Sequence, residues 1–127
     1  MSDPEGTVPT IAIVDDDEPV RSTMSSLVRS LGFEAITFGS AEEFLRSPQR
    51  HHSSCLISDV QMPGMSGLDL QSQLAAQNHR VPIIFITAFP HAEIERRARE
   101  AGAICVLSKP FESRALVECI QRALKTQ

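Results

Sequence analysis

The sequence predicts an α/β fold in which a parallel sheet of five strands lies between two layers of helices. Three observations lead to this expectation. Short apolar runs rich in β-branched residues recur along the chain, amphipathic stretches with helical spacing separate them, and the two kinds of segment alternate five times. Alternation of this kind favours a parallel sheet covered on both faces, because each crossover carries a helix over the sheet.

The expected strands are apolar runs that stop at polar residues. The first contains Ile11-Ala12-Ile13-Val14, which an acidic cluster ends, and Pro82 opens the fourth. Short, nearly continuous apolar runs are typical of strands that are buried on both faces. The five expected strands cover residues 8–14, 33–38, 55–59, 83–87 and 104–107.

The expected helices have apolar residues at helical spacing and recognisable ends. The first carries Val20, Met24, Leu27, Val28 and Leu31. Gly32 follows it as a stop signal. Ser40 with Glu43 three residues later forms a capping box, so a short second helix begins there and ends at Pro48, before a loop over 49–54. The remaining helices are expected over 67–77, over about 91–101 with Ile94, Ala98 and Ala101 on one face, and along Leu116, Ile120 and Leu124.

Topology and length complete the expected architecture. Right-handed crossovers leave few arrangements of five parallel strands, and the order 2-1-3-4-5 is a common one. A chain of 127 residues fits one domain. The polar and acidic residues 1–7 predict a flexible tail, and 8–127 predict the folded domain.

Composition excludes several functions. A formal net charge of -4 and a pI near 5.5 argue against direct binding of nucleic acid. Apolar runs stay far below the roughly 18 residues of a membrane span, and the first residues lack a signal-peptide pattern. Cys55, Cys105 and Cys119 lie in apolar stretches without metal-ligand spacing, which predicts buried free thiols in a reducing compartment. We therefore expect a cytoplasmic protein.

Polar side chains collect where the expected strands end. Ligands of open parallel sheets bind beyond the carboxyl ends of the strands, at the point where strand order reverses. In the order 2-1-3-4-5 that point lies between the first and third strands. The residues delivered to this edge are Asp15, Asp16 and Asp17 after the first strand, Asp59 after the third, Thr87 after the fourth, and Ser108 with Lys109 after the fifth.

Several carboxylates in one crevice repel one another unless a positive group lies among them. Mg²⁺ fits this need, because it takes oxygen ligands and is commonly bound by one or two carboxylates together with phosphate. One carboxylate could then attack phosphorus and form an acyl phosphate. The Lys109 ammonium and the Thr87 hydroxyl would stabilise the phosphoryl oxygens.

Each of these residues also has an ordinary structural interpretation. An acidic run after a strand commonly forms a solvated turn or a helix N-cap, and Asp17 fits that role. Aspartate is common in turns, threonine in strands and lysine on surfaces. Taken singly, the ordinary interpretation wins for each residue. Their gathering at four strand ends of one crevice favours a site.

At these residues the sequence resembles the receiver domain of bacterial two-component response regulators, a flavodoxin-like (βα)5 fold. The matching segments are Ile13-Val14-Asp15-Asp16, the run from Ile57 to Gly67 that includes Asp59-Val60-Gln61-Met62-Pro63-Gly64-Met65, Ile86-Thr87-Ala88, Ala101-Gly102-Ala103 and Lys109-Pro110-Phe111. They occur in the family's order over nearly the whole chain. Glu18-Pro19-Val20-Arg21 resembles more narrowly the nitrogen-fixation-type regulators, whose receivers precede a helix-turn-helix output domain.

The resemblance implies a role for each site residue. Asp59 is the expected phosphoacceptor, and Asp15, Asp16, Asp59 and the backbone carbonyl of Gln61 are the expected Mg²⁺ ligands. Thr87, Ala88 and Lys109 are expected to bind the phosphoryl group. The Lys109-Pro110 bond is a candidate cis peptide. Gln61 and Phe89 flank the expected approach of water and could set the rate of dephosphorylation.

One position departs from the family. Its switch places an aromatic residue three positions before the lysine, where this chain has Val106. Valine is small and stiff at χ1, so it cannot reproduce the swing of a ring. Phosphorylation would then bias a smaller motion of the fourth helix and fifth strand. The alternative is that the switch itself is aberrant.

The resemblance also implies partners. A sensor histidine kinase would supply the phosphoryl group, and the surface of the fourth helix, fifth strand and fifth helix would control output, expected to be transcription. The same surface is a candidate homodimer interface; Arg96, Arg97 and Arg99 lie on that helix, although a solvated face is their simpler interpretation. The expected protein is a self-phosphorylating acceptor with slow autodephosphorylation, not a turnover enzyme. It either acts alone or is a piece of a regulator with a C-terminal DNA-binding domain.

Three other functions compete with this one. A flavin mononucleotide binder needs a phosphate-cradling loop after the first strand, where Asp15, Asp16 and Asp17 would repel phosphate. An aspartyl-phosphate hydrolase typically needs a second carboxylate two residues past the nucleophile, where this chain has Gln61. A phosphorylation-independent docking module on the same fold is disfavoured by the complete acidic site, but Val106 keeps that alternative open.

Overall fold

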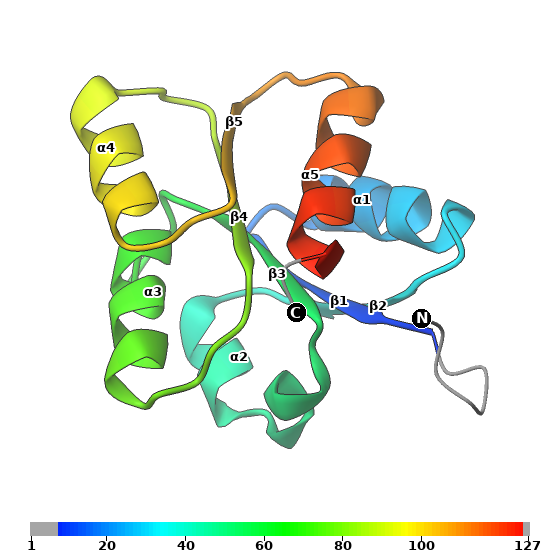
Figure 1. Ribbon diagram of the computed structural model, residues 1–127, viewed down its shortest axis with the longest axis horizontal. Helices are drawn as coiled ribbons and strands as arrows, with labels where there is room; N and C mark the ends of the chain where they lie inside the picture. Colours follow the sequence, from blue (N-terminus) through cyan, green and yellow to red (C-terminus); the bar gives the residue numbers. More distant parts are fainter. Residues whose placement is uncertain (1–7, 126–127) are drawn as a thin grey trace.

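The computed structural model describes residues 8–125, so the flexible tail expected over 1–7 lies outside the described residues. Strands and helices alternate along this part of the chain (Figure 1). The elements are β1 (Thr10–Val14), α1 (Glu18–Ser30), β2 (Glu34–Phe38), α2 (Ala41–Arg46), the 3₁₀ helix η1 (Pro48–His52), β3 (Cys55–Asp59), α3 (Gly67–Ala76), β4 (Ile83–Thr87), α4 (Ala92–Glu100), β5 (Cys105–Ser108) and α5 (Ser113–Lys125). In the described residues, the helices lack both the length and the apolar character of a membrane-crossing segment.

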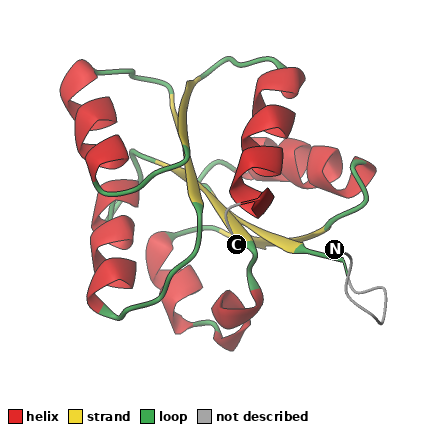
Figure 2. Cartoon of the chain, viewed as in Figure 1, coloured by secondary structure: helices red, strands yellow, loops and turns green. Residues whose placement is uncertain are grey.

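The described residues form one parallel sheet of five strands in the order β2-β1-β3-β4-β5. This confirms the predicted strand order. The central strands are buried along their whole length, as their continuous apolar runs predict. Figure 2 shows the strands passing between helices on both sides, which gives three layers.

Alternate residues of each strand face opposite helix layers, and the two faces form separate apolar clusters. On one face, Ile13, Ile57 and Ile86 pack with residues of α1 and α5, including Val28 and Ile120. On the other, Val14, Leu56 and Phe85 pack with α2, α3 and α4 through side chains such as Phe44, Leu70 and Ala98. Helix α5 completes the first face, and so it holds β5 and β4 in place.

Several element boundaries differ from the expected ones, most by a single residue, and three of the differences have a visible structural cause. β1 begins at Thr10, because Val8 is 40% exposed and pairs with no strand among the described residues. The loop expected over 49–54 is largely the 3₁₀ helix η1, which the Ser47 hydroxyl caps by accepting from the Gln49 N–H at 3.1 Å. Ala101 lies in an exposed turn after α4, so only Ile94 and Ala98 face inward as expected.

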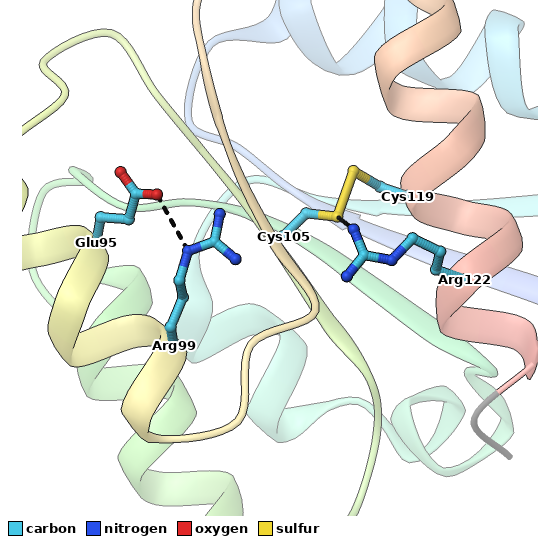
Figure 3. Close-up of a disulfide and its surroundings, with 5 residues drawn as sticks. All are labelled: Glu95, Arg99, Cys105, Cys119 and Arg122. Atoms are coloured by element: carbon cyan, nitrogen blue, oxygen red, sulfur yellow. Dashed lines mark hydrogen bonds and ion pairs between the residues drawn. A yellow bond between two sulfur atoms is a disulfide. The ribbon is translucent and has the colours of Figure 1, made fainter.

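The expectation of three free thiols is wrong for two of them. Cys105 and Cys119 form a disulfide between β5 and α5, with Cα atoms 6.1 Å apart, as Figure 3 shows. Cys55 in β3 is free and fully buried, and burial raises its pKa to about 12. The pairing depends on which face of β5 packs beneath α5, which local sequence patterns do not specify.

A close backbone approach fixes the loop after β3. The Gly67 N–H donates to the Val60 carbonyl at 2.8 Å, where α3 begins. A Cβ atom on Gly67 would lie 2.3 Å from the Asp59 carbonyl oxygen and 3.0 Å from the Phe85 ring. Glycine is therefore required where the chain returns over the end of β3, and this loop holds the backbone of Asp59 in place.

Replacing Gly67 should disturb the end of β3. We expect Gly67→Ala to lower the free energy of unfolding by about 2 to 3 kcal/mol, since the methyl group meets backbone that cannot move away cheaply. Gly39→Ala is the matched control, because its Cβ would meet only the Arg21 and Glu43 side chains at 3.5 Å, and it should cost less than about 1 kcal/mol. Urea denaturation measures both, and equal losses would contradict the close-approach interpretation.

Candidate functional site

The carboxyl ends of four neighbouring strands carry the polar side chains that the sequence places at this edge. Asp15 follows β1, Asp59 ends β3, Thr87 ends β4, and Lys109 follows β5. Backbone hydrogen bonds extend the sheet past its strand ends: the Asp15 N–H donates to the Phe38 carbonyl at 3.1 Å, and the Lys109 N–H to the Thr87 carbonyl at 2.7 Å. These backbone hydrogen bonds hold the strand ends and so position the side chains of Asp15 and Lys109.

Three carboxylates gather at this edge. Within residues 8–125, Asp15, Asp16 and Asp59 each place one carboxylate oxygen within 4.8 Å of the others. Asp15 is fully buried and Asp59 is 6% exposed, whereas Asp16 is exposed. Two of the three negative charges thus lie inside the protein, where solvation by water is weak.

The ammonium of Lys109 lies between the two buried carboxylates. Its Nζ is 3.1 Å from Asp59 Oδ2 and 3.3 Å from Asp15 Oδ2. Burial by itself lowers the pKa of Lys109, but its hydrogen bond to Asp59 and the charges of both carboxylates outweigh burial, so the pKa is raised. Lys109 therefore remains charged at neutral pH and links β5 to β1 and β3.

The pKa of the Asp59 carboxyl group is raised above its ordinary value. Burial raises the pKa of its carboxyl group most strongly, and the nearby Asp15 charge raises it further. The Lys109 ammonium and the Gln61 N–H, which is 3.3 Å from Asp59 Oδ1, lower the pKa without cancelling the effect of burial. The result is a carboxylate more basic than an ordinary aspartate, and greater basicity favours nucleophilic attack.

The loop after β1 is held by groups that sequence inspection did not single out for this role. The Asp17 N–H donates to Asp15 Oδ1 at 2.9 Å, and Arg21 Nη1 donates to the Asp15 carbonyl at 2.7 Å. Asp17 occupies the N-cap position of α1, although its side chain makes no capping hydrogen bond within the described residues. Arg21 was part of the Glu18-Pro19-Val20-Arg21 motif, and its spacing of six residues gave no signal for this contact.

The side chain of Thr87 is hydrogen-bonded to the loop after β3. Its hydroxyl donates to Gln61 Oε1 at 2.7 Å and accepts from the Phe89 N–H at 3.0 Å. Gln61, Ala88 and Phe89 are exposed, and Phe89 is 71% exposed. In this arrangement the Thr87 hydroxyl proton is directed to Gln61, so its use toward a ligand requires that bond to break.

The donor set suits a hard divalent cation. Carboxylate oxygens from Asp15, Asp16 and Asp59 converge, and such oxygens are the ligands that Mg²⁺ takes in proteins. The backbone of Gln61 lies next to Asp59 through the N–H contact to Oδ1. Lys109 contacts the two buried carboxylates, and the exposed Asp16 lies beside them, which leaves negative charge for a cation to offset.

Comparison with known proteins identifies the family. The family model described as the response regulator receiver domain matches residues 11–121. The chain belongs to the response regulator receiver family. This receiver domain is 42% identical to Nodulation protein W of Bradyrhizobium diazoefficiens over 113 residues, which are 89% of this chain and 50% of that protein.

Two further relatives support the nitrogen-fixation-type subfamily that the sequence suggested. Transcriptional regulatory protein FixJ of Rhizobium meliloti is 36% identical over 114 residues, covering 90% of this receiver and 56% of that protein. The crystal structure of FixJ-N superposes with a TM-score of 0.86 at 33% identity, covering 100% of this chain and 98% of that one. The receiver spans about half the length of the curated relatives it matches.

The structure also places the two remaining residues that the resemblance singled out. The Lys109-Pro110 peptide bond of the receiver is cis. Val106 pairs with Phe85 of β4 and packs, partly buried, against the apolar cluster beneath α2, α3 and α4. A compact side chain therefore occupies the position on β5 where the resemblance to the family implies an aromatic residue.

The raised pKa of Asp59 has a consequence for stability. The folded receiver holds the Asp59 proton more tightly than the unfolded chain, so stability falls as pH rises through the interval between the ordinary and the raised pKa. In metal-free buffer at neutral pH we expect Asp59→Asn to raise Tm, and this advantage should shrink toward acidic pH. Thermal denaturation of both proteins across that range measures the effect. Asp17→Asn, which alters an exposed carboxylate outside the cluster, should change little; a lower Tm for Asp59→Asn at neutral pH would contradict the pKa assignment.

Proposed function

We propose that this receiver accepts a phosphoryl group from a sensor histidine kinase onto Asp59 in a Mg²⁺-dependent reaction. The observation that carries the proposal is the Lys109 ammonium held between the buried carboxylates of Asp15 and Asp59, beside the exposed carboxylate of Asp16. A fully neutralised structural ion pair would need one carboxylate. Three carboxylates at one sheet edge fit a site that binds a cation and reacts with phosphate.

In the proposed reaction a carboxylate oxygen of Asp59 attacks phosphorus. An oxygen–phosphorus bond forms, the bond between phosphorus and the donor breaks, and the donor leaves with its electron pair. Bound Mg²⁺, held by Asp15, Asp16, Asp59 and the Gln61 carbonyl, would offset charge on the phosphoryl oxygens. The Lys109 ammonium, which already contacts Asp59, moves its hydrogen bond to a phosphoryl oxygen.

Thr87 and Ala88 would complete the phosphoryl site. The Thr87 hydroxyl and the Ala88 N–H lie at the end of β4, next to the strand that carries Asp59. For the hydroxyl to donate to a phosphoryl oxygen, its hydrogen bond to Gln61 must break. Thr87 thereby converts a change at Asp59 into a movement of the β4–α4 loop, and the Lys109 N–H bonded to the Thr87 carbonyl passes that movement to β5.

The proposed output surface consists of α4, β5 and α5. Val106 transmits a smaller displacement than an aromatic ring would, because its side chain has little reach and one preferred rotamer. On α4, Arg96 pairs with Glu93 and Glu100, and Arg99 pairs with Glu95 at 3.0 Å. These exposed pairs fit a solvated helix face, and they also provide charges of both signs for a homodimer contact or another partner on this surface.

A longer protein is the proposed setting for this switch. The curated relatives are about twice as long as the matched region, and one of them is named a transcriptional regulatory protein. We propose a cytoplasmic regulator in which the phosphorylated receiver controls a C-terminal DNA-binding domain, while the receiver itself does not contact nucleic acid. It acts as an acceptor with slow autodephosphorylation, and Gln61 and Phe89 flank the route of the attacking water.

A second candidate function is a docking module that works without phosphorylation. Val106 is the observation that favours it, because a receiver lacking the aromatic switch residue could present one fixed surface. This alternative gives the three clustered carboxylates no role. Phosphorylation of Asp59 without any change in the α4–β5–α5 surface would favour it over the switch.

Phosphorylation is tested by mass. Incubation with acetyl phosphate and Mg²⁺ should add one phosphoryl group, and intact-mass spectrometry should detect it. EDTA should abolish the addition, because the carboxylate cluster would lose the cation that offsets its charge. Asp59→Asn should abolish it as well.

The matched control is Asp17→Asn. It removes a carboxylate from the same loop edge but leaves the cluster of Asp15, Asp16 and Asp59 intact, so it should accept a phosphoryl group like the wild type. An unchanged mass of the folded wild-type protein under all these conditions would refute the proposed function.

The hydrogen bond between Thr87 and Gln61 is expected to slow the uptake of the phosphoryl group. Gln61→Ala frees the Thr87 hydroxyl, and loss of one competing hydrogen bond should speed phosphoryl uptake by about threefold. The time course of mass change with acetyl phosphate measures this rate. Gln73→Ala, at an exposed position of α3, is the control and should leave the rate unchanged. Slower uptake by Gln61→Ala would show that the side chain assists the reaction.

A further inference from the structure

The proposed output surface contains a covalent bond. Cys105 opens β5 and Cys119 lies midway along α5, 14 residues later, and their sulfur atoms are joined (Figure 3). The ring that this bond closes contains the rest of β5, the Lys109 loop and the first half of α5. The residue that contacts both buried carboxylates is thus part of a covalent ring between strand and helix.

One polar contact beside this buried bond favours its reduction. Cys105 and Cys119 are 4% and 5% exposed, in the apolar cluster beneath α5. Arg122, an exposed residue one turn after Cys119, donates from Nη1 to Cys105 Sγ at 3.4 Å (Figure 3). A guanidinium beside a sulfur favours the thiolate, and a stabilised thiolate leaves more readily when a disulfide is attacked. Cys105 is therefore the better leaving sulfur of the pair.

Cys55 provides an internal contrast. It lies in β3 with its side chain fully buried, and burial raises its pKa to about 12. A thiol of this kind contains almost no thiolate at neutral pH, so it does not take part in thiol–disulfide exchange. Thiol–disulfide exchange in the folded chain is therefore confined to Cys105 and Cys119.

We propose that Cys105 and Cys119 form a reversible modification site for dithiol reductants and disulfide oxidants, and that its state controls the movement of β5 and Lys109 relative to α5. The redox part stands on the disulfide and its surroundings alone. The regulatory part rests on the proposed function, because it concerns the response to phosphorylation of Asp59.

The exchange is balanced in two steps. A thiolate of the dithiol attacks Cys119 Sγ, the bond to Cys105 Sγ breaks, and Cys105 leaves as a thiolate that takes up a proton. In the mixed disulfide, the first sulfur of the reductant is bonded to Cys119 Sγ. The second thiolate of the reductant attacks that first sulfur and releases Cys119, which also takes up a proton. Two electrons pass from the dithiol, which becomes a cyclic disulfide, and its two protons balance those gained by the cysteines. A disulfide oxidant reverses the reaction.

The disulfide ring restricts the movement of the end of β5 relative to α5. With the bond formed, β5 and α5 are tied at Cys105, four residues before Lys109, so a shift of the Lys109 loop is resisted by the whole of α5. After reduction, packing within the apolar cluster and the Arg122 contact with Cys105 hold β5 to α5 without a covalent bond between them, and Lys109 keeps its backbone hydrogen bond to Thr87. Movement passed from Thr87 can then displace β5 without α5.

The redox site is tested by counting thiols. The full chain is equilibrated at graded ratios of reduced to oxidised dithiothreitol, quenched in acid, unfolded and labelled with N-ethylmaleimide, and the intact mass is measured. With three cysteines and one disulfide, we expect one label, on Cys55, at the oxidising end and three at the reducing end, with a reversible transition between them. Three labels at every ratio, or one label under every reducing condition that leaves the protein folded, would overturn the proposal.

Two variants sharpen this test. Cys119→Ala removes the ring without a large change in helix propensity, and it should abolish the transition. Cys55→Ala is the matched control: it keeps the ring and the transition and lowers the label count by one throughout. The oxidised wild type and oxidised Cys55→Ala should each melt about 10 °C above their reduced forms, and Cys119→Ala should show no such difference. Equal melting temperatures of oxidised and reduced wild type would contradict a ring that restrains β5 and α5.

The regulatory part is tested by hydrogen exchange with and without acetyl phosphate and Mg²⁺. In the reduced protein, phosphorylation should speed amide exchange over residues 105–119 by about threefold or more, and in the oxidised protein it should leave exchange there unchanged. Equal responses in both redox states would refute the coupling. Failure of Asp59 to accept a phosphoryl group in both states would refute the proposed function and the coupling with it, whereas the thiol transition would still establish the redox site.

Discussion

The contact of Lys109 with Asp15 and Asp59 is the interaction on which the arrangement of this site depends. Two carboxylates buried at neighbouring strand ends would repel each other in a medium that solvates them poorly. The Lys109 ammonium, 3.3 Å from one and 3.1 Å from the other, makes their burial tolerable. It can do so only because β5 lies beside β4, where the Lys109 N–H bonds to the Thr87 carbonyl. The charge balance and the strand order therefore require each other.

The Lys109 ammonium does not fully compensate the burial of the two carboxylates, and this makes Asp59 more basic than an ordinary aspartate. Burial and the Asp15 charge raise the pKa of Asp59, and the Lys109 ammonium and the Gln61 N–H lower it without cancelling that effect. The backbone around Asp59 does not relax to relieve this: Gly67 returns over its carbonyl, and the Ser58 hydroxyl donates to the same oxygen at 2.9 Å. A basic carboxylate on a backbone restrained in this way fits the nucleophile of the proposed phosphoryl transfer.

Alternation along β5 connects the site to both helix layers. Cys105 and Leu107 belong to the apolar cluster under α1 and α5, and Val106 packs with the opposite cluster. In the proposed switch, a displacement of Lys109 at the end of this strand would act on both faces, through the disulfide on one and through a small β-branched side chain on the other. Val106 and Cys105 are adjacent in β5, so this strand carries both the small side chain and the disulfide.

The sequence by itself determined the alternation of strands and helices, the strand order and the set of residues at the sheet edge. It could do so because burial on two faces leaves a recognisable apolar pattern, and because right-handed crossovers leave few topologies for that pattern, of which 2-1-3-4-5 is a common one. Tertiary structure alone decided contacts between side chains of different elements: the pairing of Cys105 with Cys119, the bond from Thr87 to Gln61, and the contact of Arg21 with the Asp15 carbonyl. Such contacts depend on side-chain direction and ångström-scale packing, which leave no periodic trace along the chain.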